Sequence, residues 1–154
     1  MNTDEGQKQL EGKVLWEPSV TRKNSTNLFQ YQNWLSESRN LQFDSYNDLW
    51  QWSVDQIPEF WGSLWEYFQI KSVNGYKNVL NYGPQGKRLE KAKWFTGSEL
   101  NYAEHALRFR DDKVAVVGVD ESGSKVEWSR LDLFIKTAEI AAGLRCMGVG
   151  RGDS

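Results

Sequence analysis

The most restrictive feature of this sequence is the run KVAVVGVD, residues 113–120, which is rich in β-branched side chains and almost wholly apolar. Such a run predicts a β-strand that is covered on both faces. After the turn sequence ESGS, residues 125–128 alternate in polarity and predict the second strand of a hairpin. Because a lone hairpin is barely stable in water, we expect the first strand to find further partners outside these 154 residues.

A long helix is predicted directly after this hairpin. Ser129 is a suitable N-cap, and Gly148 stands where helices commonly end in a glycine. The apolar residues at helical spacing between them are Leu131, Phe134, Ile135, Ala138, Ala141, Ala142 and Leu144. The chain stops at Ser154, where we expect another strand to begin.

The first seventy residues predict three short amphipathic helices. The first is capped by Thr26 or Asn27, the second by Asp44 or Ser45, and the third begins near Pro58. The apolar positions of these helices are Leu28, Tyr31, Trp34, Leu35, Leu49, Trp52, Val54, Phe60, Trp61, Leu64, Trp65 and Phe68. With 8 Trp, 6 Tyr and 7 Phe in the chain, these side chains need a large surface to bury them, as a core or as a docking surface.

The remaining segments are predicted to be irregular or short. Residues 1–13 are polar and predict a mobile tail, and Pro18 keeps the segment that follows extended. Turn dipeptides between residues 70 and 93 indicate a connector around a short strand at residues 78–82. A turn at Gly97 then precedes a helix through Leu100, Ala103, Ala106 and Leu107.

The charge balance and the lone cysteine exclude several classes of protein. With 19 basic and 21 acidic residues the net charge is −2, so nucleic acid and anionic membranes are not predicted partners. Cys146 can form no internal disulfide, and the first residues lack the apolar core of a secretory signal. The longest aliphatic stretch, residues 114–119, is too short to cross a bilayer. We therefore predict a cytoplasmic protein.

The last residues, GVGRGDS, contain two motifs that mislead. RGDS is a tetrapeptide that adhesion receptors read on extracellular proteins, but the composition argues against that location, and we expect Asp153 to stabilise a turn. Gly148, Gly150 and Gly152 imitate a dinucleotide-binding fingerprint. That fingerprint must follow a strand and open a helix, whereas here a helix precedes it.

No residue forms a predicted active site. His105 is the sole histidine and has no second ligand nearby in sequence, so it is predicted to be structural or at the surface. Cys146 is predicted to be a buried or partly buried thiol. Asp111 and Asp112 are expected in a turn, and the basic cluster of the connector, which also contains Glu90, in a solvated loop; this cluster comprises Lys87, Arg88, Lys91 and Lys93. We assign no catalytic, cofactor-binding or metal-binding residue.

Several elements nevertheless form one pattern along the chain. They are LWEPS, NWL, SYNDLWQWSVDQIPEFWGSLWEYF, AKWFTGSELNYAEHAL, and a strand and hairpin followed by AAGLRCMGV and GD. From Leu15 to Asp153 this pattern resembles the amino-terminal region of acetoacetyl-CoA synthetases. The last helix with GV and GD resembles adenylate-forming enzymes in general, and the FW and WF-G-LNYAE elements resemble the acetyl-CoA synthetase branch. LWEPS and LWQWSV favour the acetoacetyl member of that branch.

The resemblance implies an α+β fragment in which amphipathic helices precede the start of an α/β adenylate-forming domain. It divides the chain into a mobile tail at residues 1–13, an acetyl-CoA-synthetase-type amino-terminal region at residues 14–110, and the truncated beginning of an AMP-binding adenylation domain at residues 111–154. The remainder of the adenylation domain is then the expected packing partner of this chain.

The activity implied by the resemblance is that of an acid-thiol ligase. Acetoacetate attacks the α-phosphorus of ATP to give an acyl-adenylate and pyrophosphate, and the CoA thiol then displaces AMP, with Mg²⁺ shielding the phosphates. The phosphate loop, adenine-binding residues and catalytic lysine of the family lie downstream of Ser154. These 154 residues alone are therefore expected to be inactive and to bind none of these cofactors.

Three alternatives remain open from the sequence. The chain could be a non-catalytic module that docks on a full-length synthetase through its tryptophans. It could also belong to a synthetase for acetate or another short-chain acid. An adhesion ligand that uses RGDS is the third alternative.

Overall fold

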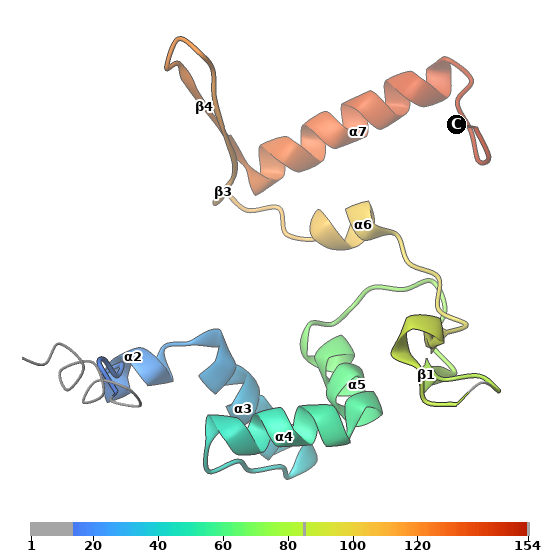
Figure 1. Cartoon of the computed structure of the whole chain (residues 1–154). Helices are drawn as coiled ribbons and strands as arrows, with labels where there is room; N and C mark the ends of the chain where they lie inside the picture. Colours follow the sequence, from blue (N-terminus) through green and yellow to red (C-terminus); the bar gives the residue numbers. More distant parts are fainter. Residues whose placement is uncertain (1–13, 85, 154) are drawn as a thin grey trace, which may run out of the picture. The chain divides into compact units, whose positions relative to one another are not determined.

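A computed structural model describes residues 14–84 and 86–153 (Figure 1). The chain divides between Gln69 and Ile70 into two compact units, which are described here one at a time. The predicted tail, residues 1–13, lies outside the described residues.

Among its described residues, the first unit contains four helices. They are α2 (Val20–Asn24), α3 (Asn27–Arg39), α4 (Tyr46–Asp55) and α5 (Ile57–Tyr67). The last three are the three predicted helices, whereas α2 was not predicted because one and a half turns are too short to show an apolar periodicity. The only local signal for α2 is Ser19, whose hydroxyl accepts a hydrogen bond from the Arg22 N–H at 3.3 Å.

The predicted caps set where the longer helices begin. Thr26 Oγ1 accepts a hydrogen bond from the Phe29 N–H at 3.2 Å, which identifies Thr26 as the N-cap of α3. Ser45 and Asp48 form a reciprocal capping box at the start of α4. Pro58 lies in the first turn of α5, where its missing N–H costs no hydrogen bond.

Apolar burial in the first unit is concentrated where α3, α4 and α5 meet. Tyr31, Leu35 and Leu49 are the buried hydrophobic residues among those described, and Leu35 is 0% exposed. Seven partly buried side chains pack around them: Trp34, Leu41, Phe43, Trp52, Phe60, Leu64 and Tyr67. Most of the predicted apolar positions of the three helices therefore contribute to one aromatic core, whereas four of them are exposed instead: Leu28, Val54, Trp61 and Phe68.

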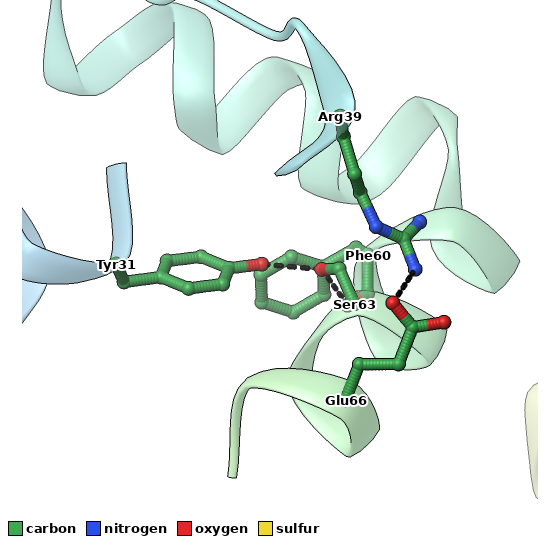
Figure 2. A network of polar contacts seen from close by, with 5 residues as sticks. All are labelled: Tyr31, Arg39, Phe60, Ser63 and Glu66. Carbon is green, nitrogen blue, oxygen red and sulfur yellow. Dashed lines mark hydrogen bonds and ion pairs between the residues drawn. The ribbon is translucent and has the colours of Figure 1, made fainter. Parts of the chain in front are cut away.

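A buried polar contact between α3 and α5 was not predicted. Gly62 and Ser63 are the buried residues of α5, because small side chains let this helix approach its neighbours closely. Figure 2 shows the Tyr31 hydroxyl directed at Ser63, with 2.5 Å between the two oxygens. Ser63 Oγ also donates to the Phe60 carbonyl at 2.7 Å, so the Tyr31 hydroxyl is the donor to Ser63. Burial raises the pKa of the Tyr31 phenol, outweighing the opposing effects of Ser63 and Arg39.

An ion pair joins the same two helices closer to solvent. Arg39 at the end of α3 contacts the Glu66 carboxylate of α5 at 2.8 Å (Figure 2). The Glu66 side chain is half exposed, so this pair adds little to stability.

The second unit contains two separate antiparallel hairpins and two helices. Its elements are β1 (Asn78–Asn81), the 3₁₀ turn η1 (Leu89–Lys91), β2 (Lys93–Thr96), α6 (Tyr102–Ala106), β3 (Val114–Val119), β4 (Lys125–Ser129) and α7 (Arg130–Cys146). Strand β1 pairs with β2, and β3 pairs with β4. The helix α7 contacts both β3 and β4. The predicted strand, hairpin and long helix are thus present, with Ser129 as the N-cap of α7 and Gly148 in the left-handed region at φ 91°.

Two elements of this unit differ from the prediction. Trp94 and Phe95 belong to strand β2, which the sequence analysis did not predict. Helix α6 is shorter than predicted and excludes Leu100 and Leu107. The reason is the side chain of Asn101, which accepts a hydrogen bond from the Glu104 N–H at 3.2 Å and so starts the helix at Tyr102.

The prediction that β3 is covered on both faces is not met by the described residues. All six residues of β3 are exposed, and Val119 is 66% exposed. Among these residues only β4 pairs with the strand and only α7 packs against it, so much of its apolar surface has no cover.

The Tyr31 to Ser63 contact generates a stability prediction. Ser63→Ala leaves the buried Tyr31 hydroxyl without its acceptor and is expected to lower the free energy of unfolding by about 1–3 kcal/mol. Tyr31→Phe leaves Ser63 bonded to the Phe60 carbonyl, so its expected cost is smaller, about 0.5–1.5 kcal/mol. Urea unfolding followed by tryptophan fluorescence measures both.

Ser53→Ala is the matched control for that prediction. Ser53 is a partly exposed serine in α4 whose hydroxyl donates to the Trp50 carbonyl, so its replacement removes the same atoms from a helix without leaving a buried group unpaired. The expected change is within about 0.5 kcal/mol. Equal losses for Ser63→Ala and Ser53→Ala would show that the buried contact adds nothing.

Candidate functional site

Strand β3 and helix α7 are joined through backbone hydrogen bonds at their shared end. The Arg130 N–H donates to the Lys113 carbonyl at 2.9 Å, and the Leu131 N–H donates to the Asp111 carbonyl at 3.2 Å. These bonds satisfy two of the N–H groups that open α7 and fix the start of the helix beside the start of the strand. The hairpin and α7 therefore form one structural element.

This element carries a group of exposed apolar side chains, which we call the hairpin surface. Its exposed members are Val114, Val116, Val117, Val119, Val126, Leu131, Ile135, Ile140 and Leu144. Ile140, in the middle of α7, is 65% exposed. A surface of this kind on a folded chain marks a place where other protein packs.

A cavity of about 280 Å³ lies beside β3 and the start of α7. Its walls are formed by Ala106, Leu107, Phe109, Val114, Ala115, Arg130 and Leu133. Arg130 is the one charged group of this lining; it contacts the Asp111 carboxylate at 3.0 Å and its guanidinium lies 5.4 Å from the centre of the Phe109 ring. This charge is already paired, and the residues of the wall include no nucleophile, so the cavity shows no catalytic group.

The first unit also has an exposed apolar stripe, on helix α4. Tyr46, Trp50 and Val54 follow one another at four-residue spacing on α4 and are all exposed, Trp50 by 51%. Leu49 and Trp52 of the same helix face the core instead. Val54 was predicted as an apolar position of the same face as Leu49 and Trp52, and the stripe itself was not predicted, although the spacing of its three residues is present in the sequence.

His105 is held by two neighbours of the second unit. Its Nδ1 lies 3.3 Å from the Lys71 backbone nitrogen, and its Nε2 lies 2.5 Å from Arg108 Nη1. Burial, and then the charges of Arg108 and Lys71, lower the pKa of the imidazole below its ordinary value. The predicted structural role of this residue agrees with these contacts.

The prediction for Cys146 is wrong, because its side chain is exposed. It lies in the last turn of α7, where no described segment covers the helix. Burial was predicted because free cysteines are among the most buried residue types, but that preference does not identify a segment that covers this turn.

The other predicted residues form no binding site. Arg88 of the basic cluster contacts Glu90 at 2.6 Å, so part of the positive charge of the cluster is neutralised within the connector. Asp111 does more than form a turn, because it also pairs with Arg130. Asp153 accepts a hydrogen bond from the Gly150 N–H at 2.6 Å, which confirms that this aspartate of the RGDS motif stabilises a turn.

Residues 14–84 and 86–153 contain neither a metal-binding cluster nor a membrane-spanning helix. No three or more His, Cys, Asp or Glu side chains come together there in a way that could hold a metal ion. No helix in the same residues has the length and apolar character needed to cross a membrane.

Comparison with known proteins gives the same family in sequence and in structure. Residues 46–106 match the family described as the acetyl-coenzyme A synthetase N-terminus. The chain is 37% identical over 147 residues to the acetoacetyl-CoA synthetase of Danio rerio and 34% identical over 147 residues to that of Xenopus tropicalis; each alignment covers 94% of this chain and 21% of the relative. The solved acetoacetyl-CoA synthetase from Streptomyces lividans superposes with a TM-score of 0.75 at 34% identity, covering 92% of this chain and 22% of that structure.

These matches confirm the resemblance to acetoacetyl-CoA synthetases and the predicted fold class. Amphipathic helices followed by small antiparallel sheets and a long helix correspond to an amino-terminal fragment of an acyl-CoA synthetase fold. The chain spans about a fifth of the length of the curated relatives it matches.

The hairpin surface generates a prediction on dye binding. The 154-residue chain is expected to bind a hydrophobic dye such as ANS without denaturant, because its apolar side chains are open to solvent. Ile140→Gln is expected to reduce the dye fluorescence while changing the free energy of unfolding by less than about 0.5 kcal/mol. Leu35→Ala is the contrasting variant, since it opens the core at a cost of about 2–5 kcal/mol and increases dye binding. A sharp cooperative melt without any dye binding would contradict the exposed surface.

Proposed function

We propose that this chain is the amino-terminal part of an acetoacetyl-CoA synthetase that activates acetoacetate with ATP and transfers it to CoA. The observation that carries the proposal is the match to acetoacetyl-CoA synthetases over 94% of the chain, in sequence and in fold. The relatives' names describe an acid-thiol ligase, and the activity of the whole protein is our inference for this one. We place it in the cytoplasm, with no nucleic acid or membrane as partner.

The proposed reaction has two displacement steps. A carboxylate oxygen of acetoacetate forms a bond to the α-phosphorus of ATP and pyrophosphate leaves; the CoA thiolate then forms the thioester bond and AMP leaves with the electrons of the broken acyl-oxygen bond. Mg²⁺ would shield the phosphate charges. The described residues do not fit a site for these groups, because they bring together no metal-ligand cluster and the one cavity cation is paired with Asp111. We therefore assign no step to a residue of this chain.

The role that we assign to these residues is to dock on and complete the adenylation domain. We propose that residues 14–110 form the amino-terminal region of the enzyme, and that residues 111–154 begin the adenylation domain, which continues beyond this chain. The exposed apolar surface of β3 supports this assignment, because an apolar strand with one hydrogen-bonded neighbour is stabilised when further strands and helices cover it.

The decisive experiment starts from the source transcript. We expect the coding sequence after the Ser154 codon to continue into a Ser/Thr/Gly-rich loop followed by a lysine. The polypeptide it encodes is expected to form AMP, pyrophosphate and acetoacetyl-CoA from acetoacetate, ATP and CoA, whereas the 154-residue chain forms none. If the encoded polypeptide prefers acetate, acetate replaces acetoacetate as the proposed substrate. A stop codon after Ser154 would overturn the proposal in favour of a non-catalytic docking module.

A variant pair in that longer polypeptide tests the role of the hairpin surface. Val117→Asp places a charge in the middle of β3 and is expected to abolish the ligase activity by preventing the strand from being covered. Ser124→Asp introduces the same charge in the β3–β4 turn and is expected to leave the activity within about twofold, because surface changes are nearly neutral. Equal activities of the two variants would show that β3 is not buried in the enzyme.

A further inference from the structure

The segment of residues 73–77 is held at both of its ends. The Val73 N–H donates to the Glu99 carbonyl at 2.9 Å, and the Lys77 N–H donates to the Thr96 carbonyl at 2.7 Å. These two backbone bonds fix where the segment starts and where it enters strand β1. The residues between them therefore span a set distance.

Asn74 and Gly75, near the middle of that segment, are exposed and unsupported. Among the residues that the structure describes, none forms a hydrogen bond with the Gly75 N–H or with the Asn74 side chain. Apart from its chain neighbours, no heavy atom lies within 4 Å of the place where a Cβ of Gly75 would be. The Gly75 backbone nitrogen is thus open to the side chain that precedes it.

We propose that Asn74 is a site of spontaneous deamidation that loosens the segment of residues 73–77 as the protein ages. The Gly75 nitrogen loses its proton to solvent and forms a bond to Cγ of Asn74. The bond from Cγ to Nδ2 breaks, and ammonia leaves. Water then opens the cyclic imide at either of its two carbonyls, giving aspartate or isoaspartate. The proposal does not rest on the proposed ligase activity.

Glycine after the asparagine is what makes this position reactive. With no Cβ, Gly75 lets the backbone reach conformations that bring its nitrogen to Cγ, whereas a larger residue crowds that approach. Asn74 and Gly75 form the only Asn-Gly pair in the sequence.

Other asparagines of the chain are held by hydrogen bonds. Asn24 is also followed by a small residue, but the Ser25 N–H donates to the Thr21 carbonyl at 3.2 Å. The side chain of Asn81 accepts from the Gly83 N–H at 2.9 Å. The attacking nitrogen in the first case and the side chain in the second are therefore engaged, and both asparagines serve as internal controls.

The test is mass spectrometry of tryptic peptides after incubation of the 154-residue protein in mildly alkaline buffer. Peptide 72–77 contains Asn74 alone, whereas peptides 24–39 and 78–87 contain the two control asparagines. We expect peptide 72–77 to show the mass increase of an amide converted to a carboxyl group well before the other two. The rate is expected to rise with pH, because the attacking nitrogen must lose its proton.

Two comparisons separate the effect of the fold from that of the dipeptide. A synthetic peptide of residues 72–77 with blocked ends gives the rate without the fold, and the folded chain is expected to react within severalfold of it. Gly75→Ala is expected to slow the reaction severalfold, since a methyl group fits there and Gly75 lies outside the left-handed region. Gly143→Ala, which also has room for a methyl group, is expected to leave the rate unchanged.

Isoaspartate lengthens the main chain by one carbon between the two backbone bonds, so the modified segment no longer matches its span. In the modified protein the amides of Val73 and Lys77 are expected to exchange with solvent faster than in the unmodified protein.

Three results would each overturn the proposal. They are a peptide 72–77 that stays unchanged in the folded chain while the synthetic peptide is converted, an equal rate for Gly75→Ala, and unchanged amide exchange after modification. The first and third need only the unaltered chain, so they decide the proposal even if Gly75→Ala fails to fold.

Discussion

The contact between α3 and α5 is the interaction on which the first unit depends. Tyr31 contributes to the apolar core through its ring and ends in a hydrogen bond to Ser63, so one side chain connects the hydrophobic and polar parts of the interface. Small residues at the buried positions of α5 make this approach possible. Aromatic side chains of α3 and α5 gather around that contact, as the ring pairs of Tyr31 with Trp34 and Tyr67 show, and Trp52 of α4 pairs with Phe60 of α5.

The second unit is organised differently, through backbone hydrogen bonds more than through burial. Its two hairpins are each closed within the unit, and the start of α7 is bonded to the segment that enters β3. None of its described hydrophobic side chains is fully buried. Strand β3 has valines on both faces and one paired neighbour, and its apolar residues are exposed. This exposure and the match to a fifth of each relative are independent observations that support the same proposal.

Much of the local structure could be predicted because it depends on nearby residues. Thr26, Ser45 and Ser129 cap the helices that follow them, and Gly148 ends α7, since capping involves only side chains and N–H groups a few positions apart. Strand β2 was not predicted because residues 82–92 separate it from its partner β1. Its pairing is therefore not visible in the residues next to it. The burial of Ser63 and the exposure of Cys146 could not be predicted for the same reason: each depends on which segment packs against the helix.

By itself, the sequence determined the three longer helices of the first unit, the β3–β4 hairpin followed by α7, and the resemblance to acetoacetyl-CoA synthetases, because these follow from local patterns of residues. The tertiary structure decided which apolar side chains are buried among the described residues and which stay exposed to solvent. It also placed His105 against Lys71, 34 positions away, and Asp111 against Arg130, 19 positions away. Such contacts depend on the path of the backbone between the two residues, and no spacing in the sequence encodes that path directly.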